Sequence, residues 1–227
     1  MKRFAYTLFA CLLISLSSCL EITEQVRVRE NGSGQFTFTV DMSEAEPLLE
    51  MVKGFSEEAN PDQVSSDLKT GMEDAHQRLQ SVKGIHQVAL IRSDNGLLSG
   101  ITFEYDNIDA LNKAINVVQN NKPELQEAYF AWNGKQLHRL NTLKIENEIR
   151  KKTGSDLNGL DLTVNGKSMK EMMNSMVYRT EYTFDQPIKS ISNSNATLSA
   201  DKRKVTLERY LLDDTRKANS LENIIKL

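Results

Sequence analysis

Two stretches of alternating apolar and polar residues near the N-terminus predict a β-hairpin. Residues 22–28 read Ile-Thr-Glu-Gln-Val-Arg-Val, and residues 36–42 read Phe-Thr-Phe-Thr-Val-Asp-Met. Between them, Asn31-Gly32-Ser33-Gly34 supplies residues that accept the positive φ angles of tight turns. The period of two and the intervening turn predict two antiparallel strands with one buried face.

Two later segments have the period of amphipathic helices. The first starts at Asn60-Pro61-Asp62-Gln63, because Asn is a favoured N-cap and proline is favoured at the first helical position. Its stripe consists of Val64, Leu68, Gly71, Met72, Ala75, Leu79 and Val82. Gly84 is expected to end this helix. The second helix has Asp106 or Asn107 as its cap and carries Ile108, Leu111, Ile115 and Val118.

Further strands are expected around these helices. Residues 86–91 and 97–105 flank the turn Asp94-Asn95-Gly96, and a third strand pair is expected around Asn133-Gly134. From the second strand onward the order is β-α-β-β-α-β, that of a ferredoxin-like unit. The sequence therefore predicts an α+β fold, with an antiparallel or mixed sheet built from hairpins and the two main amphipathic helices on one face.

The C-terminal part is expected to be smaller and β-rich. Residues 151–158 are polar and contain glycine, so they are a candidate boundary. We therefore divide the chain into a signal peptide (1–18), a hairpin-rich α+β domain (19–150) and a C-terminal part (151–227). This last part either forms a unit of its own or completes the same domain.

Four features are expected within the C-terminal part. Ser168 and Glu171 have the spacing of a capping box at the start of a short helix. A strand begins at Tyr178, and Pro187 should end it or place it at a sheet edge. A hairpin is expected within residues 197–210. The apolar positions 221, 224 and 225 predict a terminal helical turn.

The first residues have the pattern of an export signal. Met1-Lys2-Arg3 is basic, and residues 4–16 are apolar except for one threonine and one serine. This stretch is shorter than the roughly 20 apolar residues that span a bilayer. It closes with Leu16-Ser17-Ser18-Cys19, which resembles the lipobox of bacterial lipoproteins: an aliphatic residue, two small residues and a cysteine. The resemblance implies cleavage before Cys19, diacylglyceryl transfer to its thiol and acylation of the new amine, for example by palmitate.

Acylation of Cys19 would attach the chain firmly to a membrane. Each buried methylene contributes about 0.8 kcal/mol, and several acyl chains exceed the marginal binding of one chain. Cys11 is the only other cysteine, and Phe9 is too large for a lipobox position before it. No thiol would then remain in the mature chain for a disulfide or a thiolate metal site. The alternatives are an uncleaved N-terminal helix and secretion with Cys19 left free.

Composition limits the class of partner. The chain has a formal net charge of −3 and a charged fraction of 26%, which is ordinary for a globular domain. No basic block dominates, so we expect no nucleic-acid partner. No second run of about 18 apolar residues follows the leader, so no later membrane span is expected.

Short motifs beyond the leader resemble uncharacterised envelope lipoproteins of Gram-negative bacteria. These motifs are Leu20-Glu21-Ile22, the Asn31–Gly34 turn, Tyr182-Thr183-Phe184 and Pro187-Ile188-Lys189-Ser190. The pairing of a lipobox with an early hairpin is also similar to the LppM-type lipoprotein domain. The resemblance implies an envelope location and an α+β fold, and it supplies no active site. By analogy with other lipoproteins, Leu20 after the cysteine favours the outer membrane.

No catalytic or cofactor motif stands out. His76, His86 and His138 lack the spacing of metal ligands, and there is no Gly-x-Ser-x-Gly or phosphate-binding glycine loop. Asp213-Asp214 could serve glycoside chemistry in principle, but adjacent side chains tend to diverge. We therefore expect no metal, no cofactor and no enzymatic activity.

Two apolar groups are candidate ligand or partner surfaces. Met169, Met172, Met173 and Met176 share one helical face, a spacing typical of a helix packed on a sheet. Methionine also suits variable apolar ligands or Cu(I), of which we favour the apolar ligand. Trp132, with Tyr129 and Phe130, is either sheet core or a contact patch for lipid headgroups.

The sequence thus favours a lipid-anchored cell-envelope domain of a non-enzymatic, binding or interaction type. Its expected partners are the membrane, through acylated Cys19, and an envelope protein or apolar ligand. The alternatives are a carrier or sensor of an apolar ligand at the membrane surface, and an envelope hydrolase whose site is assembled from distant residues.

Overall fold

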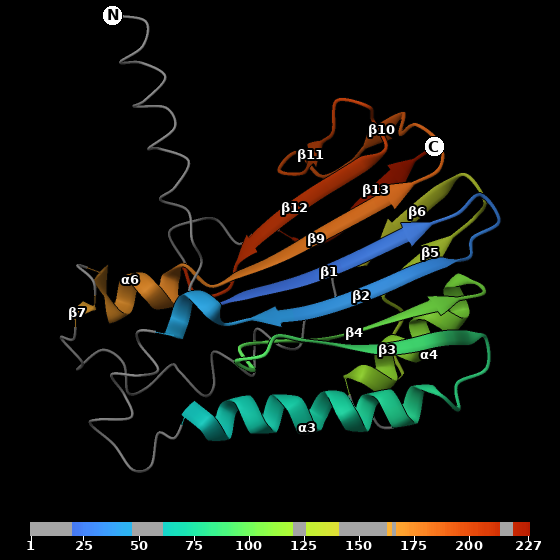
Figure 1. The fold of residues 1–227 in the computed structure, drawn as a ribbon. Coiled ribbons are helices and arrows are strands. Elements are labelled where there is room, and N and C mark those ends of the chain that lie inside the picture. The colour runs from blue at the N-terminus through green and yellow to red at the C-terminus, as the bar shows by residue number, and fades with distance from the viewer. Residues whose placement is uncertain (1–19, 47–60, 120–125, 141–162, 165–166, 214–219) are drawn as a thin grey trace, which may run out of the picture.

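The computed structural model describes residues 20–46, 61–119, 126–140, 163–164, 167–213 and 220–227. Its largest element is a seven-stranded mixed sheet with the strand order β11-β12-β9-β1-β2-β4-β3 (Figure 1). Its strands are β1 (Glu21–Val28), β2 (Gly34–Asp41), β3 (Ile85–Arg92), β4 (Leu98–Tyr105), β9 (Val177–Phe184), β11 (Thr197–Leu198) and β12 (Lys204–Tyr210).

A second sheet and three α-helices complete the described fold. The second sheet has the order β10-β13-β6-β5, and β7 pairs with β8 separately. These strands are β5 (Phe130–Trp132), β6 (Gln136–Arg139), β7 (Thr163–Val164), β8 (Lys167–Ser168), β10 (Ser190–Ile191) and β13 (Asn223–Lys226). The helices are α3 (Pro61–Leu79), α4 (Ile108–Val118), α6 (Met169–Asn174) and the short 3-10 helix η1 (Ser43–Ala45).

Strand β1 lies at the centre of the large sheet. It pairs antiparallel with β2 through the expected turn, where Gly32 has φ +81°, and parallel with β9. Glu21 is therefore opposite Val177, and Val28 is opposite Phe184. The N-terminal hairpin and the C-terminal part consequently form one sheet.

The helices cover the half of the sheet that contains β3 and β4. Helices α3 and α4 contact each other and both strands. Of the two expected stripes they bury Met72, Ala75, Leu79, Ile108, Leu111 and Ile115, whereas Gly71 is exposed. Asn107 caps α4 by accepting a hydrogen bond from the Ala110 amide at 2.9 Å. Because this bond satisfies an otherwise unpaired N–H, the helix begins at Ile108.

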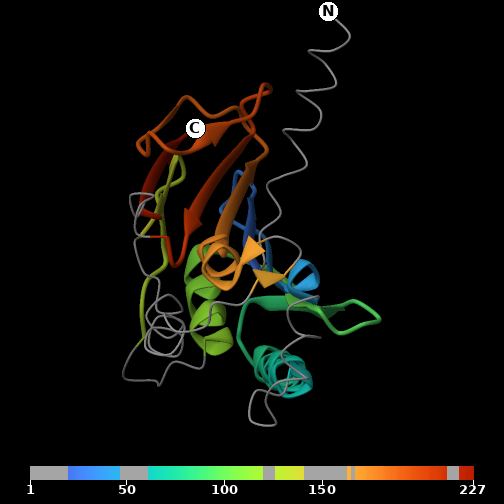
Figure 2. The same ribbon diagram turned by 90° about the vertical axis from the view of Figure 1, so that its left-hand side faces the viewer.

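The second sheet covers the β1 and β9 half on the same side as α4 (Figure 2). Arg139 of β6 binds the carboxylate of Glu24 on β1. The Phe130 ring of β5 meets the Tyr182 ring of β9 edge-on, with centroids 5.8 Å apart. The core therefore lies between the seven-stranded sheet and a layer made partly of helix and partly of sheet.

The α+β fold class with hairpins and two main helices is confirmed. The β-α-β-β-α-β order from β2 to β5 is also present. However, the last strand of that series, β5, lies in the second sheet, and β1 occupies the place beside β2. The boundary expected at residues 151–158 lies outside the described residues.

Two local expectations were wrong. Residues 221–225 do not form a helical turn, because Asn223–Lys226 is strand β13, paired with β6. Helix α3 ends at Leu79, and Gly84, with φ +84°, instead makes the turn into β3. Pro187 lies after the end of β9, as expected, but β9 is an interior strand between β12 and β1.

Among the described helices, none is long and apolar enough to cross a bilayer.

Candidate binding surface

The outward face of the large sheet is polar. Side chains alternate along β1, so Ile22, Val26 and Val28 are buried while Gln25 and Arg27 are exposed. The outward residues of neighbouring strands pair laterally, as the Thr37 and Thr102 hydroxyls do at 2.9 Å. Such a face can form hydrogen bonds with a ligand, whereas the opposite face is filled by core.

A hollow of about 410 Å³ lies on this face where β1, β2, β9 and the turn before β12 converge. We call it the distal hollow. It is lined by Gln25, Val26, Arg27, Gln35, Thr37, Glu181, Thr183, Phe184, Asp185, Asp201 and Arg203. Its lining thus combines amides and hydroxyls with charges of both signs.

The carboxylates of the distal hollow already have partners. Glu181 receives bonds from Lys204 at 2.7 Å and Gln25 at 3.0 Å. Asp201 accepts the Ser199 hydroxyl at 2.5 Å and the Arg203 amide at 3.2 Å. The Ser199 bond, followed by the Arg203 amide, lowers the pKa of Asp201, so this group stays ionised.

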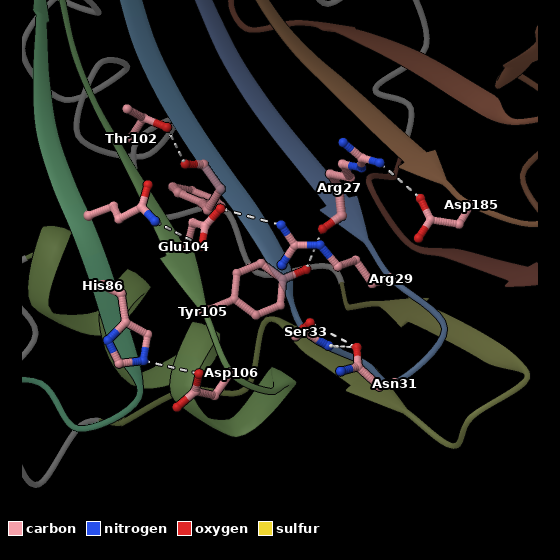
Figure 3. Close-up of polar contacts among 12 residues, drawn as sticks. Arg27, Arg29, Asn31, Ser33, His86, Thr102, Glu104, Tyr105, Asp106 and Asp185 are labelled. Atoms are coloured by element: carbon pink, nitrogen blue, oxygen red, sulfur yellow. Dashed lines mark hydrogen bonds and ion pairs between the residues drawn. The ribbon is translucent and has the colours of Figure 1, made fainter.

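The tip of the β1–β2 hairpin is held by polar contacts that Figure 3 shows. Arg27 pairs with Asp185 at 3.1 Å, and Arg29 pairs with Glu104 at 3.3 Å. The Tyr105 hydroxyl donates to the Arg27 carbonyl at 2.8 Å, and burial raises the pKa of this tyrosine. The two arginines of the tip are therefore already paired.

Other cations at this end of the sheet are not paired in this way. Lys135, Lys189, Lys202, Arg203 and Lys226 are all exposed, and we call them the basic rim. Lys189 donates to the Leu227 carbonyl at 2.9 Å. For the other four side chains, no hydrogen bond or ion pair occurs within the part of the chain that the structure describes. The rim therefore offers positive charge to a partner.

Backbone hydrogen bonds place the basic rim residues side by side. The Leu227 amide binds the Lys135 carbonyl at 2.9 Å, and the Lys189 amide binds the Lys226 carbonyl at 2.8 Å. The Ile188 amide binds the Lys202 carbonyl at 2.6 Å. Arg203 belongs both to the basic rim and to the lining of the distal hollow. The rim and the hollow are thus one continuous surface.

The opposite end of the sheet is where β1 begins. The Leu20 carbonyl accepts the Val177 amide at 3.0 Å, so the backbone is ordered by pairing with β9 one residue after Cys19. Glu44, Glu46 and Asp94 are exposed there, and none has an ion-pair partner among the described residues. Exposed carboxylates without an ion-pair partner thus lie where β1 begins, and the basic rim lies toward the end where β1 finishes (Figure 1).

Cys19, the expected lipid attachment site, lies outside the described residues. Met172 is 7% exposed in the core, and Met176 packs against that core. Neither lines the distal hollow. The side chains of Met169 and Met173 lie outside the described part. The expected capping box is present, because Glu171 accepts the Ser168 amide at 2.7 Å and donates its own amide to the Ser168 hydroxyl at 3.2 Å.

Trp132 joins two hairpins. It is partly buried, and its indole lies against Gly32 in the β1–β2 turn, where an added Cβ would be 2.8 Å from Nε1. Tyr129 and Phe130 are buried. The aromatic cluster is therefore mostly core, with Trp132 at its margin.

The histidines are dispersed. His76 contacts the Val88 carbonyl at 3.3 Å, His86 pairs with Asp106 at 3.0 Å, and His138 pairs with Glu222 at 3.2 Å. Within the described ranges, no group of three or more His, Cys, Asp or Glu side chains could hold a metal ion. Asp213 is buried, and its neighbour Asp214 lies outside the described residues.

Among the described residues, Glu24 and Arg139 are the most deeply buried charged side chains, and they bind each other. Glu24 accepts Nε and Nη2 of Arg139 and the hydroxyls of Tyr178 and Tyr182. Burial works to lower the pKa of Arg139, but Glu24 together with Tyr182 and Tyr178 raises that pKa overall. With its oxygens occupied, this cluster has a structural role.

The basic rim was not predicted from the sequence. Its cations come from separate turns and strand ends, so no basic block appears along the chain. The one local indication of it was the run Lys202-Arg203-Lys204, which lies in a predicted turn.

Comparisons with known proteins give one solved structure. No protein-family model and no curated protein matches the chain. The NMR structure of the Mycobacterium tuberculosis LppM folded domain aligns over 92% of this chain and 90% of that one, with 8% sequence identity and a TM-score of 0.39. At this level the overlap does not establish a shared fold.

Proposed function

We propose that the chain is a lipid-anchored, non-enzymatic binding domain of the bacterial cell envelope. The lipobox-like Leu16-Ser17-Ser18-Cys19 supports cleavage of residues 1–18 and acylation of Cys19. The observation that carries the proposal is the start of β1 at Glu21, with Leu20 already bonded to Val177. Acylated Cys19 would thus hold the sheet directly at a bilayer, without a long tether.

The binding role is supported by the surface at the far end of the sheet. The distal hollow and the basic rim present hydrogen-bonding groups and positive charge on the side remote from the anchor. The packed positions of Met172 and Met176 give no support to a carrier built on the methionine helix. Leu20 after the cysteine favours the outer membrane of a Gram-negative cell.

Acylation is tested by labelling cells that express the full chain with an alkyne analogue of palmitate. We expect the wild-type chain and a Cys11→Ala variant to be labelled equally, and Cys19→Ala to be unlabelled and to keep its leader. Equal labelling of Cys19→Ala would contradict the proposed anchor. Membrane fractionation of the labelled chain then separates inner from outer membrane.

A further inference from the structure

We propose that the basic rim and the distal hollow together bind an acidic glycan, meaning a sugar chain that carries carboxylate or phosphate groups. The inference rests on the proposed binding role and names the ligand class for it.

The charge of the rim points to an anionic ligand. The side chains of Lys135, Lys202, Arg203 and Lys226 are exposed and lack hydrogen-bond or ion-pair partners within the described ranges. Nearby Asp185 is paired with Arg27, whereas Asp201 accepts hydrogen bonds from the Ser199 hydroxyl and the Arg203 amide and keeps its negative charge. The exposed cations of the basic rim still outnumber the exposed carboxylates near it, so this edge attracts an anion.

The spread of the rim points to a polymer instead of a single anion. Its cations come from the β5–β6 turn, the end of β13, the segment before β10 and the turn before β12. Lysines on separate loops act as independent point charges, whereas one small anion would need several donors converging on it. A chain with repeated anionic groups can contact these cations in succession.

The distal hollow adds groups suited to hydroxyls. The side chains of Gln35 and Thr183 are neutral and have no hydrogen-bond partner within the described ranges, and they line the hollow together with Thr37. The paired carboxylates of Glu181 and Asp185 can still accept hydrogen bonds from ligand hydroxyls, since each carboxylate has about four acceptor positions. A hydroxyl-rich chain matches this lining better than an acidic peptide, which has few hydroxyls.

Two other polyanions match less well. The aromatic residue of the hollow, Phe184, is only 2% exposed, so it offers no platform on which nucleic-acid bases could stack. An anionic membrane is flat and would use the rim without the hollow. The rim also lies at the end of the sheet remote from Leu20, and so remote from the anchor.

The test uses the full chain in neutral detergent micelles, so that binding can be measured whether or not Cys19 is acylated. Polygalacturonate is the carboxylated probe, a phosphorylated mannan is the phosphate probe, and dextran is the neutral control. We expect binding of at least one acidic glycan at low ionic strength, little binding of dextran, and weakening as salt is added.

Matched variants locate the site. The double variant Lys202→Gln/Arg203→Gln should weaken glycan binding roughly tenfold, because it removes two unpaired cations. The control Lys69→Gln/Lys113→Gln changes the net charge equally at exposed helix positions, and it should bind as the wild type does. Equal weakening by both variants, or no binding by the wild type, would overturn the proposal.

A last comparison separates the glycan from other anions. Thr183→Val keeps the β-branched shape and removes a hydroxyl, so it should weaken glycan binding and leave poly-glutamate binding unchanged. If poly-glutamate binds as tightly as both acidic glycans, the ligand class is an acidic peptide and the proposal is wrong. If phosphatidylglycerol vesicles bind as tightly, the ligand is an anionic lipid surface and the proposal is also wrong. If the labelling experiment shows that Cys19 is not acylated, the glycan affinities measured in micelles should be unchanged. The anchor proposal and the glycan proposal can therefore fail independently.

Discussion

Arg139 and Glu24 form a two-bond ion pair across the interface between the two sheets. Nε and Nη2 of Arg139 lie 3.1 and 3.0 Å from the two carboxylate oxygens of Glu24, and the side chains are 1% and 4% exposed. The guanidinium also lies 5.1 Å from the centre of the Phe130 ring. The joint between the sheets is therefore a buried charge pair enclosed by aromatic rings.

Removing one partner of this pair should be costly. Arg139→Met leaves the Glu24 carboxylate buried without its cation, so we expect the free energy of unfolding to fall by about 3–5 kcal/mol. Arg27→Met is the matched control, because its pair with Asp185 is exposed and should be worth under about 1 kcal/mol. Urea unfolding followed by circular dichroism measures both. Similar losses for the two variants would show that the buried pair is not the joint.

The tyrosines beside Glu24 should make the fold sensitive to alkali. Burial, and then the Glu24 charge, raises the pKa of Tyr178 and of Tyr182. An unfolded tyrosine ionises near pH 10, while these remain protonated in the folded chain. The unfolded state then binds fewer protons, so stability should be intact below about pH 10 and fall as the pH rises further.

Phenylalanine variants check this pH dependence. In Tyr182→Phe the free energy of unfolding should decrease less steeply between roughly pH 10 and 11.5 than in the wild type, because the tyrosine hydroxyl with the raised pKa has been removed. Tyr210→Phe, at a partly exposed position in β12, is the control. An unchanged slope for Tyr182→Phe would contradict the assignment.

The contact between Gly32 and Trp132 should make that turn intolerant of a side chain. Gly32→Ala introduces both an unfavourable positive φ and a Cβ 2.8 Å from the indole nitrogen, so we expect a loss of roughly 2–4 kcal/mol. Gly96→Ala has a similar φ of +73° and open space, and should cost about 1–2 kcal/mol. Thermal unfolding compares the two, and the fluorescence of the single tryptophan should shift in Gly32→Ala alone.

The position of β1 predicts how the domain stands on a bilayer. A strand of eight residues is about 25 Å long, so the β5–β6 turn should lie well away from the start of β1, where we propose the acyl anchor. In vesicles, a fluorophore on Ser43→Cys should be quenched strongly by headgroup-linked quenchers, and one on Lys135→Cys weakly. Equal quenching would mean that the domain lies flat on the membrane.

Local patterns in the sequence predicted the hairpins and helices well. The period of two around Gly32, the cap at Asn107 and the Ser168–Glu171 box all depend on neighbouring residues, so the chain itself displays them. The helical turn predicted at residues 221–225 was wrong, because a short apolar run fits a strand or a helix equally.

Long-range features were not visible in this way. The pairing of β1 with β9 joins segments far apart, and no local rule selects a parallel neighbour. Glu24 and Arg139 did leave a signal, since each occupies an inward position of its strand, in phase with Val26 and Leu137. Two opposite charges at such positions indicate a buried pair, but the sequence does not show that they meet.

The intact mass of the full chain purified from membranes tests the central claim most directly. We expect a chain that lacks residues 1–18 and carries a diacylglyceryl group and an amide-linked acyl chain on Cys19. A chain that retains Met1, or one that starts elsewhere with an unmodified Cys19, would contradict the anchor and the orientation derived from it.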